Sequence, residues 1–218
     1  LMFVLVAVTL IMLHRRQWLL AGLAAALATL SRPNALAVCA ACLVASVDAI
    51  RERREWESII APVLSPLGYL GFQIFLARHT GETFVWFRVQ HDAWNEGFSL
   101  GFATVRVVGR ALLHPFNSPG RDITIVVLIL AVLMVWRSWR AKLPRTWWAY
   151  SIVILFFLLS PSTVGPRPRY LLTAFPLLIG TAATWPDDDR QVWPIVTSVL
   201  GAMLVALVAL YGGLGAVP

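Results

Sequence analysis

The chain has 218 residues, of which 59% are hydrophobic and only 13% are charged, and its mean hydropathy is +0.74. A soluble domain carries about a quarter charged residues, so this composition excludes an ordinary soluble protein and predicts an all-α, polytopic transmembrane protein. The formal charge is +7, but the basic residues are spread through short links between apolar stretches. Without a basic arm or patch, this charge argues against nucleic acid as a partner.

Apolar stretches predict about eight membrane segments. They are 1 to 13, 18 to 30, 35 to 49, 59 to 77, 123 to 136, 146 to 160, 169 to 184 and 192 to 211. Several are shorter than the roughly 20 residues needed to cross a bilayer, so we expect some to be short or re-entrant. Because the sequence opens inside an apolar stretch, we interpret 1–218 as a single transmembrane domain, the C-terminal part of a longer membrane domain.

Basic residues in the short links predict the orientation of these segments. They are Arg15, Arg16, Arg51, Arg53, Arg54, Arg137, Arg140, Lys142 and Arg145. If each segment crosses or returns, all of them fall on one side, which the positive-inside rule makes cytoplasmic. The interval 78–122 and the link around Pro161 to Arg169 then lie on the outer side.

The interval 78–122 is too polar to span the bilayer and too apolar for a free loop. Within it, Phe98 to Leu113 carries apolar residues on one face, with Arg106 and Arg110 four residues apart on the other. This pattern is typical of an amphipathic helix that lies in the membrane interface. We therefore predict an outer loop containing one interfacial helix.

The same interval holds the first group of candidate binding residues. They are Gln90, Trp94, Asn95 and Glu96. An indole ring can stack on a sugar, and amide and carboxylate groups can bind its hydroxyls. An aromatic anchor with a solvated polar face remains the alternative. His91, Asp92 and Glu96 lack a second His at helical spacing, so we expect neither a metal site nor a cofactor.

Arginines on the outer side form the second group. Arg32 precedes Pro33, which disfavours helix at the residue before it and frees backbone groups at the tip of a hairpin. Arg167, Arg169 and Tyr170 lie in a stiff Pro-Arg-Pro-Arg-Tyr stretch. A guanidinium at such places suits a lipid phosphate, and simple anchoring of Arg and Tyr among the headgroups is the alternative.

Three blocks of sequence resemble a known family. They are Ala-Thr-Leu-Ser-Arg-Pro-Asn at 28–34, Thr-Phe-Val-Trp-Phe-Arg-Val-Gln-His-Asp-Ala-Trp-Asn-Glu-Gly-Phe at 83–98, and Pro-Arg-Tyr-Leu-Leu-Thr-Ala-Phe-Pro at 168–176. In this order they are similar to the PIG-V-like mannosyltransferases. These are membrane glycosyltransferases of GT-C type, which include the enzymes that add the second mannose of glycosylphosphatidylinositol anchors.

The resemblance implies a mannosyltransferase in the bacterial plasma membrane. Mannose would pass from a polyprenyl-phosphate donor to a lipid-linked or surface acceptor on the non-cytoplasmic face, without a cofactor. Arg32, Arg167 and Arg169 would bind phosphate, and the group from Gln90 to Glu96 would bind sugar or acceptor. The family's essential acidic residue precedes the matching blocks, so the catalytic residue is expected upstream and the 218-residue chain alone is expected to be inactive.

Two other classes of function stay open. Short, broken helices and an arginine at membrane depth also suit a lipid or small-solute transporter. A non-catalytic membrane subunit would show the same composition. The two halves of the sequence show no convincing similarity to each other, whereas an inverted repeat would favour transport.

Overall fold

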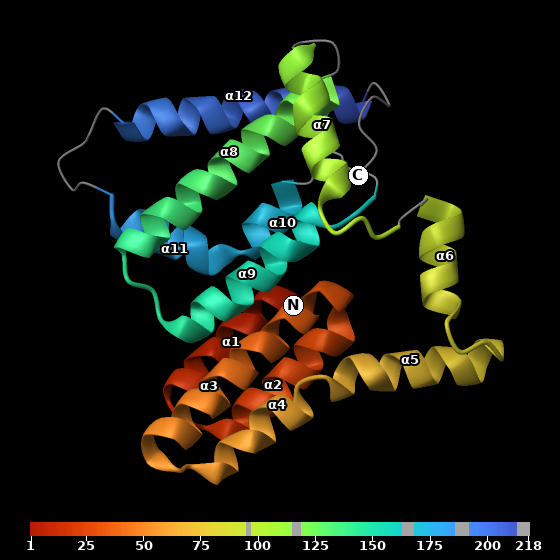
Figure 1. Cartoon of the computed structure of the whole chain (residues 1–218), viewed down its shortest axis with the longest axis vertical. Helices are drawn as coiled ribbons and strands as arrows, with labels where there is room; N and C mark the ends of the chain where they lie inside the picture. The colour runs from red at the N-terminus through yellow and green to blue at the C-terminus, as the bar shows by residue number, and fades with distance from the viewer. Residues whose placement is uncertain (95–96, 115–118, 163–167, 186–191, 213–218) are drawn as a thin grey trace.

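The structure is a computed structural model that describes residues 1–94, 97–114, 119–162, 168–185 and 192–212. Within these ranges every regular element is a helix, and the sole β-type pairing is one isolated bridge (Figure 1). This confirms the predicted all-α class.

The first half of the chain forms a tight group of helices followed by one that leaves it. These elements are α1 (Met2–His14), α2 (Trp18–Ser31), η1 (Pro33–Leu36), α3 (Ala37–Arg53), η2 (Trp56–Ile59), α4 (Ile60–Leu64) and α5 (Leu67–Thr80). The second half adds α6 (Val85–Trp94), α7 (Phe102–Leu113), α8 (Pro119–Arg140), α9 (Arg145–Leu159), α10 (Pro168–Thr173), α11 (Phe175–Ala183) and α12 (Val192–Gly212). Helix α9 packs along α3 and joins the two halves.

Two helical runs in the described part of the chain are long and apolar enough to cross a membrane, judged by length and composition. They are Pro33–Arg53, with 21 residues, and Trp56–Thr80, with 25. The first corrects the expectation of a short segment at 35–49, because η1 and α3 continue to Arg53 and reach about 30 Å at 1.5 Å per residue. Helix α2, with 14 residues, is short as expected.

Small residues let α2 approach α4 and α5 closely. A Cβ atom at Gly68 would overlap the backbone carbonyl of Ala26, so the two backbones touch there. The Oγ1 of Thr29 donates a hydrogen bond of 2.8 Å to the carbonyl oxygen of Ser65. Close approach through Gly, Ala, Ser and Thr is the usual mode of helix packing in membranes.

The break between α4 and α5 follows from proline chemistry. Pro66 has no N–H, so the carbonyl oxygen of Pro62 loses its helical donor. The Oγ of Ser65 donates to that oxygen instead, at 3.1 Å. Helix α5 then leaves the bundle in its own direction, as Figure 1 shows.

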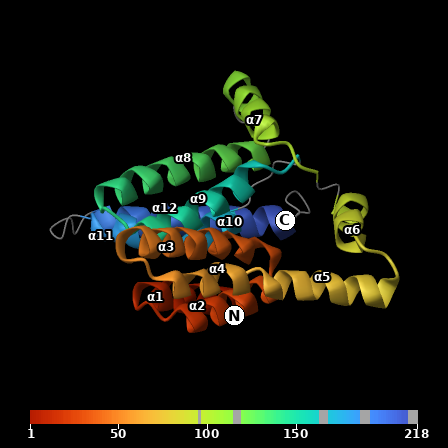
Figure 2. The ribbon, with the colours of Figure 1, turned by 60° about the horizontal axis from the view of Figure 1, so that its bottom comes forward.

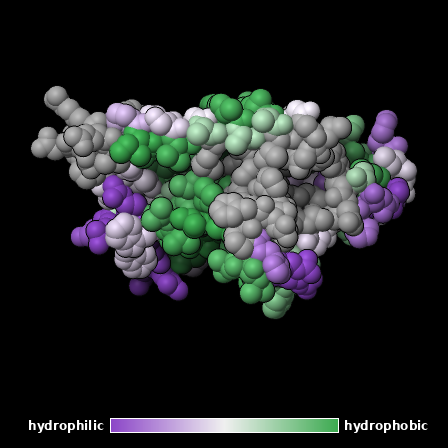
Figure 3. All heavy atoms as spheres, turned by 90° about the horizontal axis from the view of Figure 1, so that it is seen from above, coloured by the Kyte–Doolittle hydropathy of each residue, from purple (hydrophilic) through white to green (hydrophobic). Residues whose placement is uncertain are grey.

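Three of the basic links meet at one end of the molecule. Arg16, in the α1–α2 link, pairs with Glu55 at 3.2 Å, and Arg145, at the start of α9, pairs with Asp48 of α3 at 2.7 Å. Exposed ion pairs of this kind add little stability, but they show which links lie next to each other. They confirm that these links share one end, which we call the basic end. On the face in Figure 3, hydrophobic residues gather left of the centre, and hydrophilic residues lie at both ends and along the lower edge.

The interval 78–122 holds two helices rather than the single one predicted. Figures 1 and 2 both show α6 and α7 running across the direction of α5 and α12, at the end of the molecule away from the basic end. Helix α7 begins at Phe102, four residues after the predicted start. Helix α6 was not predicted, because its ten residues carry charges and amides that suggest a loop.

Candidate functional site

A short pairing connects the α6–α7 link to the end of α9. Phe98 and Pro161 form an isolated antiparallel bridge. Beside it, the N–H of Ser99 donates to the carbonyl oxygen of Ser160 at 2.7 Å. We call Gly97–Gly101 the strap, since it ties two segments more than 60 residues apart in sequence.

Serine side chains reinforce the strap on both sides. The Oγ of Ser162 accepts a hydrogen bond of 2.8 Å from the N–H of Gly97, and the N–H of Ser162 donates to the Gly97 carbonyl, also at 2.8 Å. The Oγ of Ser99 donates to the carbonyl of Pro161 at 3.0 Å. Thr104, in the first turn of α7, donates to the carbonyl of Leu159 at 2.9 Å. The start of α7 is therefore fixed to the end of α9.

The strap forms one wall of a cavity of about 460 Å³, which we call the outer pocket. It is lined by Pro33, Asn34, Leu36, Tyr69, Trp86, Phe87, Gly97, Phe98, Phe157, Ser160 and Pro161. These residues come from η1, α5, α6, the strap and the end of α9. A mostly apolar and aromatic cavity with a few polar groups is typical of small-molecule sites, and its volume lies within their usual range.

Ser160 supplies the most informative polar group of the outer pocket. The residue is 2% exposed, and its Oγ has no hydrogen-bond partner among the described residues. An unpaired buried hydroxyl costs about 1 to 3 kcal/mol. Gln73, one turn after Tyr69 on α5, likewise has a buried and unpaired Nε2 atom within the described chain. Gln73 does not line the outer pocket, whereas Ser160 does, and a hydroxyl without a partner there fits a ligand that carries hydroxyl or other polar atoms.

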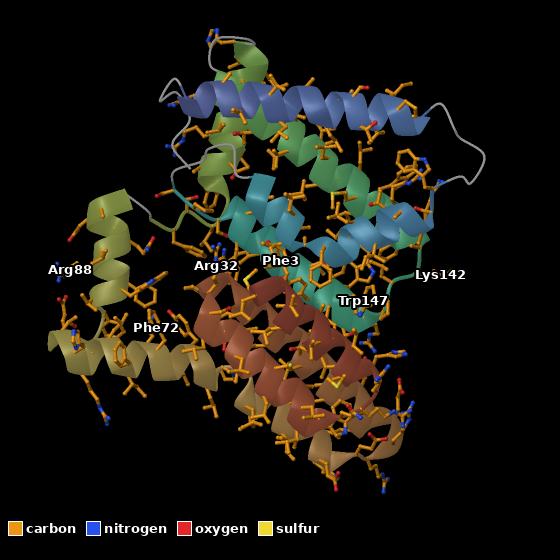
Figure 4. The ribbon with its side chains drawn as sticks, turned by 180° about the vertical axis from the view of Figure 1, so that it is seen from behind. Phe3, Arg32, Phe72, Arg88, Lys142 and Trp147 are labelled. Carbon is orange, nitrogen blue, oxygen red and sulfur yellow. The ribbon has the colours of Figure 1, made fainter. Side chains whose placement is uncertain are left out.

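Arg32 lies directly before the residues that line the outer pocket. Its backbone is extended, with φ −156° and ψ 138°, and Pro33 opens η1 after it, which confirms the predicted break in the helix. Its side chain is exposed and forms no ion pair or hydrogen bond with any described residue. Figure 4 shows Arg32 at the tip of the α2–α3 hairpin, on the side of the bundle where α6 lies.

Among the predicted binding residues on α6, Gln90 is the one whose side chain the structure describes. Gln90 is half-buried and lies one turn after Trp86, which lines the pocket, so both belong to one face of α6. Gln90 itself is not a lining residue. Trp94 ends α6, and its side chain lies outside the described structure, as do Asn95 and Glu96 entirely. Their proposed roles stay predictions.

Arg88 lies on the opposite face of α6, as Figure 4 shows. Its Nε and one terminal nitrogen bind the two carboxylate oxygens of Glu82 at 2.8 and 2.6 Å. A second carboxylate, that of Asp92, lies 3.8 Å from Arg88. The hydrogen bond from Arg88 lowers the pKa of Glu82 below its usual value. Arg88 therefore holds the start of α6 and is not free to bind an anion.

The Pro-Arg-Pro-Arg-Tyr stretch is described only in part. Arg167 lies outside the described residues. Arg169 and Tyr170 belong to the backbone of α10, but their side chains are not described. The role of Arg167 and Arg169 in binding phosphate together with Arg32 stays a prediction.

Several lining residues were missed from the sequence. Tyr69, Phe157 and Ser160 lie inside or at the end of apolar stretches, where nothing distinguishes them from lipid-facing or interfacial residues. Trp86 and Phe87 lie in the block resembling the mannosyltransferases, but read alone they indicate an aromatic belt. These residues line one cavity because the strap pairs two segments that are distant in sequence, and no local sequence pattern predicts that pairing.

Within the described ranges, no three His, Cys, Asp or Glu side chains gather as a metal site would require. In the part of the chain that the structure describes, the fold and the site thus define a helical protein with two candidate membrane spans and an aromatic pocket away from its basic end. Comparison with known protein families, with curated proteins and with solved structures finds no match to this chain.

Proposed function

We propose that the chain is part of a multi-pass glycosyltransferase in a bacterial plasma membrane, where it moves mannose from a polyprenyl-phosphate donor to a lipid-linked or surface acceptor. The observation that carries this proposal is the outer pocket, which is lined by aromatic side chains and by Ser160, whose hydroxyl has no partner among the described residues. Aromatic faces and a few placed polar groups suit a sugar ring. The pocket also brings together parts of two of the three blocks that resemble the mannosyltransferases.

The charges support the same assignment. Arg32 adjoins the lining residues Pro33 and Asn34, and no described acidic side chain pairs with it. An unpaired guanidinium beside an apolar cavity favours a phosphate ester, because charge-assisted hydrogen bonds are strong where water is scarce. Arg167 and Arg169 are further phosphate candidates, and Gln90 is a candidate for the sugar or acceptor.

The chemistry would be a single displacement at the sugar carbon. An acceptor hydroxyl forms the new C–O bond while the bond to the phosphate oxygen breaks, so the configuration inverts and polyprenyl phosphate leaves. A carboxylate that takes the hydroxyl proton typically contributes about 10² to 10⁴-fold, and we assign this role to no residue of the chain. The described residues would orient the sugar and neutralise the leaving phosphate.

Photolabelling tests the proposal without requiring turnover. The 218-residue chain, reconstituted in bilayers, is labelled with a photoreactive analogue of polyprenyl-phosphate mannose, with unlabelled donor as competitor. We expect Ser160→Ala to lower the apparent affinity about 5-fold, the value of one hydrogen bond. Trp86→Ala and Arg32→Gln should each weaken labelling at least as much.

Trp56→Ala is the matched control, because this Trp is 66% exposed and precedes α4, far from the outer pocket. It should label like the original chain. Labelling that is unchanged in Ser160→Ala, Trp86→Ala and Arg32→Gln would show that the outer pocket does not bind the donor. Donor-driven movement of labelled solute across sealed vesicles would instead favour a transporter.

A further inference from the structure

Helix α7 presents three different faces. Thr104 and Ala111, seven residues apart, are buried against the protein. A second face is apolar and open, where Phe102 and Val105 are each 72% exposed and Leu112 is 71% exposed. Large apolar side chains exposed to this degree on one helix indicate contact with a partner or a membrane.

The third face of α7 is cationic. Arg106 and Arg110 lie four residues apart and are exposed. Neither forms an ion pair with any described residue. Arg88 on α6 differs, because two carboxylates surround it. An arginine pair with no ion-pair partner among the described residues, beside an open apolar face, is complementary to anionic headgroups at a membrane surface.

A second cavity, of about 580 Å³, lies between α7, α8 and α9, and we call it the α7 groove. It is lined by Leu100, Gly101, Phe102, Thr104, Val105, Leu128, Ala131, Val132, Val135, Leu155, Leu158 and Leu159. Its one polar side chain, Thr104, already donates to the carbonyl of Leu159. Among the described residues, the lining of the α7 groove therefore offers no free polar side chain, and the groove suits a hydrocarbon chain.

The cationic face and the groove adjoin each other. Phe102 lines the groove, and Arg106 follows it by four residues, so the apolar face and the cationic face border each other at these two residues. A molecule with a hydrocarbon chain in the groove can reach Arg106 with its head. The strap separates this site from the outer pocket, since Gly97 and Phe98 line one cavity and Leu100 and Gly101 the other.

We infer that α7 and its groove form a binding site for an anionic phospholipid, with one acyl chain in the groove and the phosphate on Arg106 and Arg110. Because the strap fixes the start of α7, an occupied site would also hold the wall of the outer pocket in place. The inference rests on the membrane location in the proposed function, but not on sugar transfer.

Lipid retention measures this site directly. The full chain is purified with equal amounts of phosphatidylglycerol and phosphatidylcholine of identical acyl chains, and retained lipids are counted by native mass spectrometry. Each arginine near an anionic headgroup is worth about a 5-fold change in affinity. We therefore expect Arg106→Gln with Arg110→Gln to abolish the preference for phosphatidylglycerol. Val132→Trp, at an exposed position of the groove, should reduce retention of both lipids.

Arg78→Gln provides the matched control, because Arg78 is exposed at the end of α5 and does not line the groove. It should leave lipid retention unchanged, whereas a fall equal to that of the double variant would mean general charge attraction and overturn the site. Equal retention of both lipids by the original chain would also overturn it. Displacement of phosphatidylglycerol by polyprenyl-phosphate mannose would assign the groove to the donor. Donor photolabelling is scored separately, so failure of either proposal leaves the other measurable.

Discussion

The carbonyl oxygen of Ser65 accepts a hydrogen bond from Oγ1 of Thr29 at 2.8 Å, where α4 ends and α5 begins. This bond is buried and joins residues 36 positions apart. It fixes the direction in which α5 leaves the bundle, and α5 carries Tyr69 to the outer pocket. The site thus depends on packing inside the N-terminal bundle.

Thr29→Val removes this bond while keeping the side-chain shape. We expect a loss of about 1 kcal/mol in the free energy of unfolding, the typical net value of a hydrogen bond. Thermal unfolding in matched detergent micelles measures the change. Thr80→Val is the control, because Thr80 is exposed and, within the described chain, bonds only to the nearby backbone groups of Leu76 and Glu82. Equal effects of the two variants would contradict the assigned role of Thr29.

Gly68→Ala should destabilise the protein by about 1 to 3 kcal/mol, because its Cβ would overlap the Ala26 carbonyl and force α2 and α5 apart. Gly71, one turn further along α5, has open space where a Cβ would lie, with no neighbouring atom within 4 Å. Gly71→Ala should therefore be neutral or stabilise α5, since Ala favours helix over Gly by about 1 kcal/mol. Denaturation of both variants checks the contrast, and the reverse order would refute the close helix contact.

Ser162→Ala should loosen the strap. The variant leaves the Gly97 N–H without its side-chain acceptor, while the backbone bond from Ser162 to Gly97 remains. We expect hydrogen exchange at Gly97 and Ser99 to rise several-fold, as local opening becomes easier. Ser31→Ala is a suitable control, since the one hydrogen bond of the Ser31 side chain to a described residue goes to the nearby carbonyl of Ala28. Unchanged exchange at the strap would mean that its backbone bonds suffice.

The Glu82–Arg88 pair should make the start of α6 sensitive to acid. The pKa of Glu82 is lowered in the folded protein, so the pair stabilises α6 above the usual pKa of Glu and is lost as the pH falls through the lowered value. A spin label at the exposed position of His91 should become more mobile over that acidic range. Glu82→Gln should show the mobile signal already at pH 7, with no further change on acidification.

The arrangement of the basic end predicts sidedness. In a chain whose native Cys39 and Cys42 are replaced, single cysteines at Arg53 and Arg145 should react with an impermeant reagent from the same side of sealed vesicles. A cysteine at His91 on α6 should react from the other side. Reaction of positions 53 and 91 from one face would refute the membrane orientation.

Composition and apolar periodicity alone determined the helical class and most helix positions, because burial of backbone polar groups in an apolar chain leaves helix as the available structure. Arg counting also predicted that the basic links share one end, and Pro33 predicted the break after Arg32. Each of these signals depends on residues that are close together in the sequence, so they can be recognised without the tertiary structure.

Only the tertiary structure decided what meets at the outer pocket. Tyr69 and Trp86 come from two successive helices, and Ser160 lies far beyond them in the sequence. The pairing of Phe98 with Pro161 that gathers them leaves no periodic trace in either segment. The sequence pattern also failed to predict helix α6, because a contact outside the helix holds its start. Its charges indicate a loop until Glu82 is seen to hold Arg88, and that contact depends on the turn after α5. Long-range pairing and local ion pairs depend on where the chain turns, and hydrophobic pattern does not encode this.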